Sequence, residues 1–99
     1  MSRYDVYANP SGLGYLLDVQ ADILQPLNTR AVVPLVPLSE APKPAKTLNP
    51  VFDIHDELHA MVTQYIAAVP VSELQNPVCS LRKQHDDIVG AIDFLFHGF

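Results

Sequence analysis

The sequence predicts one mainly β domain, residues 1–99, that ends in a single α-helix. Nine prolines are spread over the 99 residues, and proline interrupts a helix because it lacks an amide proton and its ring clashes with the preceding turn. Several short segments alternate apolar and polar residues between turn-forming residues, which is typical of half-buried strands. Only the last stretch repeats apolar residues every three or four positions, as an amphipathic helix does.

The first two strands are expected to form a hairpin. Residues 4–8 alternate between two faces, and residues 15–20 form a second strand-like segment. The turn-rich sequence between them is Asn9-Pro10-Ser11-Gly12-Leu13-Gly14. A connection this short favours antiparallel pairing of the two segments.

A third strand is expected over residues 31–38, which are rich in β-branched residues but include two prolines. Proline cannot donate a hydrogen bond to a neighbouring strand, so Pro34 is expected at a sheet edge or a bulge. Residues 39–49 hold two further prolines and two lysines and indicate a solvated loop. Residues 51–54 and 58–69 predict two or three more strands, which Pro70 ends.

The C-terminal helix is predicted from apolar spacing. Ser80 is a suitable N-cap because its hydroxyl accepts a hydrogen bond from a free backbone N–H. Gly98 is a suitable end because glycine readily adopts the left-handed conformation. The predicted buried face consists of residues three or four positions apart: Leu81, His85, Ile88, Ile92, Leu95 and Phe99.

Two residues on the helix point to a partner. Phe94 lies on the polar arc, which predicts either burial against another chain or exposure for a partner. Asp93 lies near the end of the helix, where the helix dipole disfavours an anion. It is therefore either solvated or bonded to a hydrogen-bond donor of a partner.

Composition excludes several classes of function. Eleven acidic residues outnumber six basic ones, for a net charge of −5. The basic residues are dispersed, whereas binding to a phosphate backbone needs them clustered, so direct nucleic-acid binding is not expected. Cys79 is the single cysteine, so no intrachain disulfide forms and a reducing cytoplasm fits. Residues 1–5 contain no apolar signal region, and no apolar run approaches about 18 residues, so neither secretion nor membrane insertion is expected.

No catalytic, metal or cofactor site is predicted. Gly12 and Gly14 form an isolated pair in a turn rather than a phosphate-binding loop. Cys79 has no neighbouring base in the sequence that would activate its thiol. His55 and His59 have a spacing that would hold zinc on a helix, but their surroundings predict strand and turn, so surface hairpin histidines are expected. His85 is expected to be hydrogen-bonded in the core or at an interface.

Several stretches of the chain carry a family likeness when taken together. They are Tyr15–Leu24, Thr29–Leu35, Leu48–Ile54, Ala67–Ser72 and Asp86–Phe99. In this order they resemble segments of the CcdB toxins, the toxin half of a bacterial toxin–antitoxin pair. The likeness covers nearly the whole chain and is weakest at residues 9–14 and 39–47.

The resemblance implies an SH3-like, largely antiparallel β-barrel with a small β-wing and a C-terminal helix. It implies a cytoplasmic homodimer that binds the A subunit of DNA gyrase and traps the enzyme on cleaved DNA, without being an enzyme itself. A cognate CcdA-like antitoxin is expected to neutralise it by wrapping an unstructured segment over its surface.

The resemblance also assigns the gyrase contact to particular positions. The family ends in Trp-Gly-Ile, which is central to poisoning and matches His97, Gly98 and Phe99 here. Other positions at or beside the contact match Ile23, Leu24, Asp93 and Phe96.

Two departures from the family leave other functions open. His97 replaces a tryptophan and removes stacking area, while Asp93 replaces an asparagine and only accepts hydrogen bonds. Either change weakens poisoning or fits a differently shaped target. One alternative is a non-toxic relative that binds antitoxin alone, which His97 favours. Another is a ribonuclease, since related toxins with this barrel cleave RNA, although the net charge of −5 argues against it.

Overall fold

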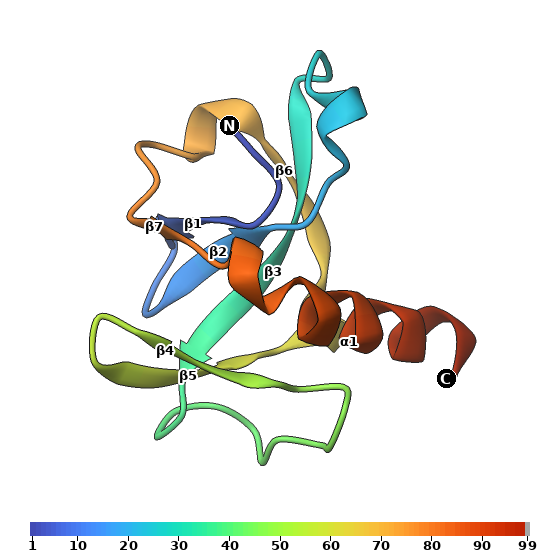
Figure 1. Cartoon of the computed structure of the whole chain (residues 1–99). Helices are drawn as coiled ribbons and strands as arrows, with labels where there is room; N and C mark the ends of the chain where they lie inside the picture. The colour runs from blue at the N-terminus through green and yellow to red at the C-terminus, as the bar shows by residue number, and fades with distance from the viewer. Residues whose placement is uncertain (99) are drawn as a thin grey trace.

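The computed structural model describes residues 1–98, and Phe99 lies outside the described residues. Within that range, one antiparallel sheet curls into a nearly closed barrel, and one long helix lies against it (Figure 1). The strands are paired in the order β4-β5-β3-β2-β1-β7, and β6 also pairs with β3. Their bounds are β1 Asp5–Ala8, β2 Tyr15–Asp18, β3 Thr29–Pro37, β4 Val51–Ile54, β5 Glu57–Met61, β6 Ala67–Pro70 and β7 Cys79–Ser80. The predicted mainly β fold is confirmed.

Helices fill the connections and the C-terminal part. The short 3₁₀-helices are η1 Asp22–Leu24, η2 Thr63–Tyr65, η3 Val71–Glu73 and η4 Arg82–Gln84. The one α-helix of the described chain, α1, spans His85–His97. None of these helices has the length and apolar character that crossing a membrane requires.

The predicted hairpin of β1 and β2 is present, with Val6 opposite Leu17. Its turn ends at Gly14, where φ is 86° and an added Cβ would lie 2.1 Å from the carbonyl oxygen of Leu35, so only glycine fits. A second hairpin, β4–β5, turns at His55 and Asp56, which both have positive φ. This hairpin corresponds to the expected β-wing.

Pro34 lies in a central strand, so its predicted place at an edge or bulge is wrong. β3 pairs with β2 on one side, while on the other it pairs with β6 over its first residues and with β5 over its last. Pro34 lies where the partner changes, and its carbonyl accepts a hydrogen bond from the amide of Val62 at 3.0 Å. In an antiparallel strand the backbone N and O atoms of one residue point to the same side. The N–H that Pro34 lacks would therefore point to the gap between β5 and β6, where no strand partner needs it.

The two faces of the sheet bury different side chains. The larger core includes Val6, Leu17, Val33 and Leu35, and α1 adds Ile88. The opposite face buries Tyr7, Leu16 and Val32 beneath Leu74, together with a charged pair, Asp18 and Arg30. The division arises because neighbouring residues along a strand point to opposite faces of the sheet.

The start of the helix differs from the prediction. Ser80 belongs to β7, where it pairs with Asp5, and its hydroxyl accepts a hydrogen bond from the amide of Arg82 at the start of η4. It is therefore not the N-cap of α1, which begins at His85 after this 3₁₀ turn. His85 is exposed rather than part of the buried face, but its Nδ1 is hydrogen-bonded to the Tyr4 hydroxyl, as a hydrogen-bonding role requires.

Candidate functional site

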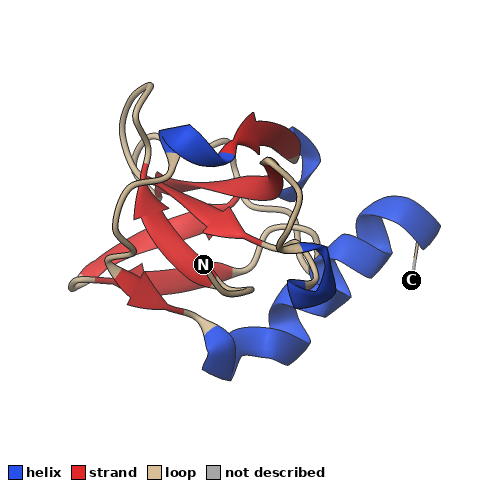
Figure 2. Cartoon of the chain, turned by 90° about the horizontal axis from the view of Figure 1, so that it is seen from above, coloured by secondary structure: helices blue, strands red, loops and turns tan. Residues whose placement is uncertain are grey.

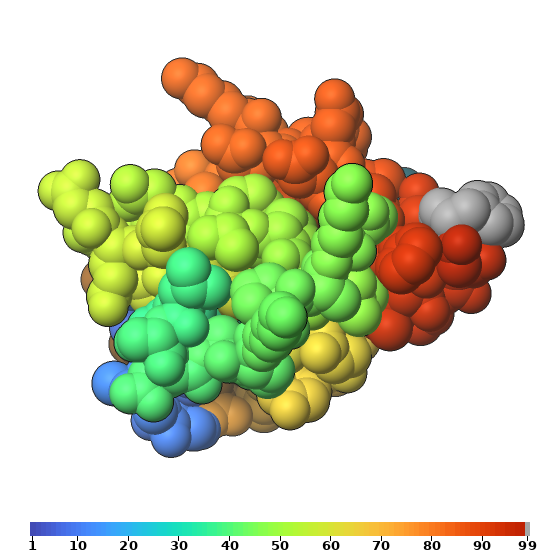
Figure 3. Space-filling model, turned by 90° about the horizontal axis from the view of Figure 1, so that it is seen from below, coloured from blue at the N-terminus to red at the C-terminus, as the bar shows by residue number. Residues whose placement is uncertain are grey.

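The end of α1 extends beyond the strands (Figure 2), and the predicted tail residues that the structure describes are exposed to solvent. In the view from below, its last turns form one end of the molecular surface (Figure 3). Phe96 is 62% exposed, and Asp93, His97 and Gly98 are also exposed. The fifth predicted residue of this region, Phe99, lies outside the described residues.

Helical periodicity explains this presentation. Ile88 and Ala91 are buried against the barrel, so residues at other angles around the helix face outward. Gly98 ends the helix as predicted, with φ of 78° and its amide donating to the carbonyl of Phe94 at 2.9 Å. Phe94 remains 38% exposed, which agrees with its position on the polar arc.

The other predicted residues lie on the loop that joins β2 to β3. Ile23 is 85% exposed and Leu24 is 45% exposed, both within η1. Outward-facing aliphatic side chains of this size on a short loop are available for a partner. Figure 1 shows η1 and the end of α1 well apart, so within one chain the predicted residues form two separate patches. We call them the loop patch (Ile23, Leu24) and the tail patch (Asp93, Phe96, His97, Gly98).

Sequence reasoning did not single out Tyr65, an exposed aromatic residue on the element that packs against α1. Tyr65 belongs to η2, which packs against α1, and its side chain is 58% exposed. No periodic pattern indicated it because η2 is an irregular break between β5 and β6.

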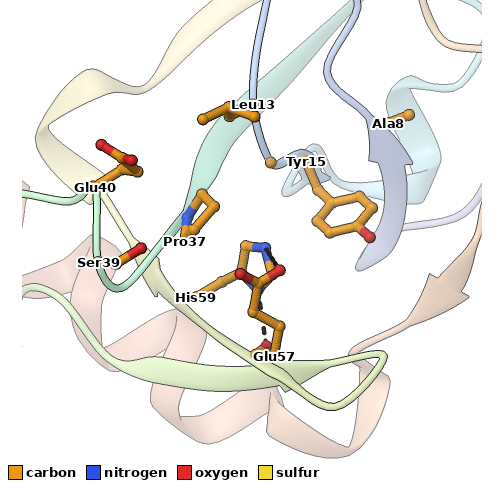
Figure 4. A pocket seen from close by; sticks show the side chains of 9 residues that line it. Ala8, Leu13, Tyr15, Pro37, Ser39, Glu40, Glu57 and His59 are labelled. Carbon is orange, nitrogen blue, oxygen red and sulfur yellow. Dashed lines mark hydrogen bonds and ion pairs between the residues drawn. The ribbon is translucent and has the colours of Figure 1, made fainter.

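A cavity of about 400 Å³ lies away from the helix, between the β1–β2 turn, the end of β3 and β5 (Figure 4). His59 lies in it and is only 1% exposed, so the expectation of a surface histidine is wrong for this residue. Its Nδ1 donates to the backbone carbonyl of Glu57 at 2.9 Å, and the Tyr15 ring lies 5.1 Å from its own ring. His55, in contrast, is exposed in the hairpin turn as expected.

The charges around this cavity do not suit an RNA substrate. Glu40 and Glu57 line it, and neither lysine nor arginine is among the described residues that do so. Binding of a phosphate backbone is favoured by clustered basic side chains, and carboxylates repel it. The described lining of this cavity therefore offers no lysine or arginine to a phosphate group.

Cys79 also lacks the setting of a nucleophile. It is half-buried in the edge strand β7, and burial raises the pKa of its thiol, with a further increase from the charge of Asp5. A raised pKa leaves little of the reactive thiolate at neutral pH. Within residues 1–98, no three His, Cys, Asp or Glu side chains are placed to hold a metal ion together.

Comparison with known protein families shows a match over most of the chain. The family model described as CcdB protein matches residues 3–98, which is almost the entire chain. The match spans all the described strands, the loop patch and the tail patch. The chain therefore belongs to the CcdB family, the toxins of a bacterial toxin–antitoxin system.

Proposed function

We propose that this chain is a toxin that binds the A subunit of DNA gyrase, traps the enzyme on cleaved DNA and arrests growth. On this proposal it acts by binding rather than by catalysis and needs no cofactor. Family membership supports this function. The observation that carries it is the exposure of Phe96, at 62%, near the end of a helix that extends beyond the barrel.

The exposed ring of Phe96 has the properties of a residue that anchors a protein–protein interface. An aromatic ring that solvent surrounds in the free chain gains burial only when a partner covers it. Ile23 and Leu24 add aliphatic area on a second surface. We infer that the chain is a homodimer, so that each patch occurs twice. The two-fold symmetry of such a dimer would match the two-fold symmetry of gyrase. Neutralisation by a CcdA-like antitoxin in the cytoplasm belongs to the same proposal.

Purified protein tests the function directly. The chain should inhibit supercoiling by gyrase and increase the amount of cleaved DNA that denaturant releases from the enzyme. Deleting residues 97–99 should abolish both effects while the melting temperature and antitoxin binding stay nearly unchanged. An unmodified chain that leaves gyrase unaffected but still binds its antitoxin would contradict gyrase poisoning and identify a non-toxic relative.

A matched pair of substitutions separates the tail patch from general surface apolarity. Phe96→Ala should weaken gyrase binding by about 2 kcal/mol, the size expected for a central anchor. Leu13→Ala removes a side chain of similar exposure, 67%, from the β1–β2 turn and should leave gyrase binding unchanged. Equal effects of the two substitutions would argue against the tail patch.

A further inference from the structure

The loop patch lies on a segment that has no apolar packing of its own. Every residue from 21 to 29 is exposed, and η1 contributes no buried side chain. A loop without buried side chains keeps one conformation only if hydrogen bonds hold it. The contacts that fix this loop therefore decide where Ile23 and Leu24 are held.

One side chain joins the middle of this loop to the strand that follows it. Gln20 lies two residues after the end of β2 and is only 9% exposed. Its Nε2 donates to the carbonyl of Leu24 at 3.2 Å and to that of Thr29 at 3.1 Å. Its Oε1 accepts from the amide of Ala31 at 3.0 Å. The amide group thus spans the loop and uses both its donor and its acceptor.

Gln20 is itself held in place by the buried charged pair. Its backbone amide donates to Oδ1 of Asp18 at 3.0 Å, and the other carboxylate oxygen, Oδ2, accepts from Nε of Arg30 at 2.9 Å. Asp18 and Arg30 have no exposed side-chain surface. Outside this network, Asp22 accepts a hydrogen bond from the amide of Arg3, a contact that is exposed to solvent.

We propose that Gln20 is a positioning residue for gyrase binding: it holds the loop so that Ile23 and Leu24 meet the partner already ordered. This inference rests on the proposed function. Gln20 is almost fully buried and does not itself face a partner. It acts by preorganisation, because a loop that is ordered before binding does not lose that freedom on binding.

Gln20→Met tests this role because methionine keeps the unbranched length and lacks both hydrogen-bonding groups. The amides of Leu24, Gln25 and Leu27 report the state of the loop, since each donates to a carbonyl within it. Their hydrogen exchange should become about tenfold faster, and the affinity for the gyrase A subunit should fall about tenfold. Gln20→Glu is a second variant, which keeps the acceptor and loses the donor.

Ile54→Ala is the matched control for a general loss of stability. Ile54 is buried in β4, and Figure 1 places this strand far from η1. This variant should melt at a lower temperature. When both proteins are folded, it should bind gyrase A within about twofold of the unmodified chain, and its loop amides should exchange as before.

A double-mutant cycle tests whether Gln20 acts through the loop patch. In a chain carrying Ile23→Ala and Leu24→Ala, the contacts that Gln20 positions are gone, so adding Gln20→Met should change affinity by less than about twofold. A tenfold effect that persists in this background would overturn the inference. So would a Gln20→Met chain with unchanged loop exchange or unchanged affinity. If the unmodified chain does not bind gyrase A at all, the proposed function fails, and the inference falls with it.

Discussion

The guanidinium of Arg30 lies 2.6 Å from the carboxylate of Asp18, and neither side chain is exposed. Burial raises the pKa of Asp18, and hydrogen bonds from the Arg30 side chain and the Gln20 backbone oppose that increase. A buried pair of this kind depends on both members, because the loss of one leaves an unpaired charge in the interior.

Asp18→Asn should therefore lower the free energy of unfolding by about 3–5 kcal/mol, since the charge of Arg30 remains buried without its counterion. The joint replacement Asp18→Leu with Arg30→Met should recover much of that loss. Urea unfolding measures both effects. Arg82→Ala, at an exposed position, is the control and should change stability by no more than about 0.5 kcal/mol. A loss below about 1 kcal/mol for Asp18→Asn would show that the pair is not critical.

Because Tyr7 is buried, the folded protein should lose stability at alkaline pH, where the phenol ionises. Its side chain is 1% exposed, and burial raises its pKa from 10.0 to about 12. The pKa of Tyr7 is higher in the folded state than in the unfolded state. The neutral phenol therefore contributes to the free energy of unfolding in full below pH 10. This contribution is lost as pH rises through 12, by roughly 2–3 kcal/mol in all.

Tyr7→Phe should remove this dependence. Among the described residues the Tyr7 hydroxyl has no hydrogen-bond partner, so its removal should leave stability at pH 8 unchanged or raise it by about 1 kcal/mol. Urea unfolding of both proteins at pH 8, 10 and 11 gives the comparison. Parallel curves over this range would contradict the assignment to Tyr7.

The turn of the β4–β5 hairpin offers a stabilising substitution. His55 and Asp56 have φ values of 51° and 67°, which glycine adopts more easily than other residues. Asp56→Gly should raise the free energy of unfolding by about 0.5 kcal/mol. Asp53→Gly, within β4, should instead lower it by about 0.5–1 kcal/mol. Thermal melting distinguishes the two, and gyrase binding should stay unchanged in both.

The two hairpin histidines should differ on truncation. His55→Ala should have little effect on stability, whereas His59→Ala removes a buried ring and should cost about 2 kcal/mol. Neither should change toxicity once the amount of folded protein is matched, because neither is expected to take part in catalysis or metal binding. A large loss of toxicity at normal stability would reveal a function for the cavity around His59.

His97→Trp should keep or strengthen the poisoning of a gyrase that accepts the family's usual tail. His97 is exposed on the last turn of α1, so a larger ring fits without displacing the core. The larger ring offers more stacking area to the target. Cleaved-DNA formation at increasing protein concentration measures the change, and a weaker effect would show that this chain is adapted to a different surface.

Local patterns in the sequence were sufficient for much of the fold. Alternation marked β1, the segment after the turn residues marked β2, apolar spacing marked α1, and Gly98 marked its end. These features depend on neighbours in the chain, because strand and helix periodicities are local properties. The exposure of Phe94 also agrees with its position on the polar arc of the helix.

Tertiary structure alone decided the features that depend on distant residues. Pro34 fits a central strand because β5 and β6 meet opposite it, and His59 is buried because Tyr15 packs against it. Gln20 looked like one more strand residue in the sequence, yet it bonds to both Leu24 and Ala31. Burial and hydrogen-bond partners depend on contacts between segments that folding brings together. Local patterns along the chain do not specify these contacts.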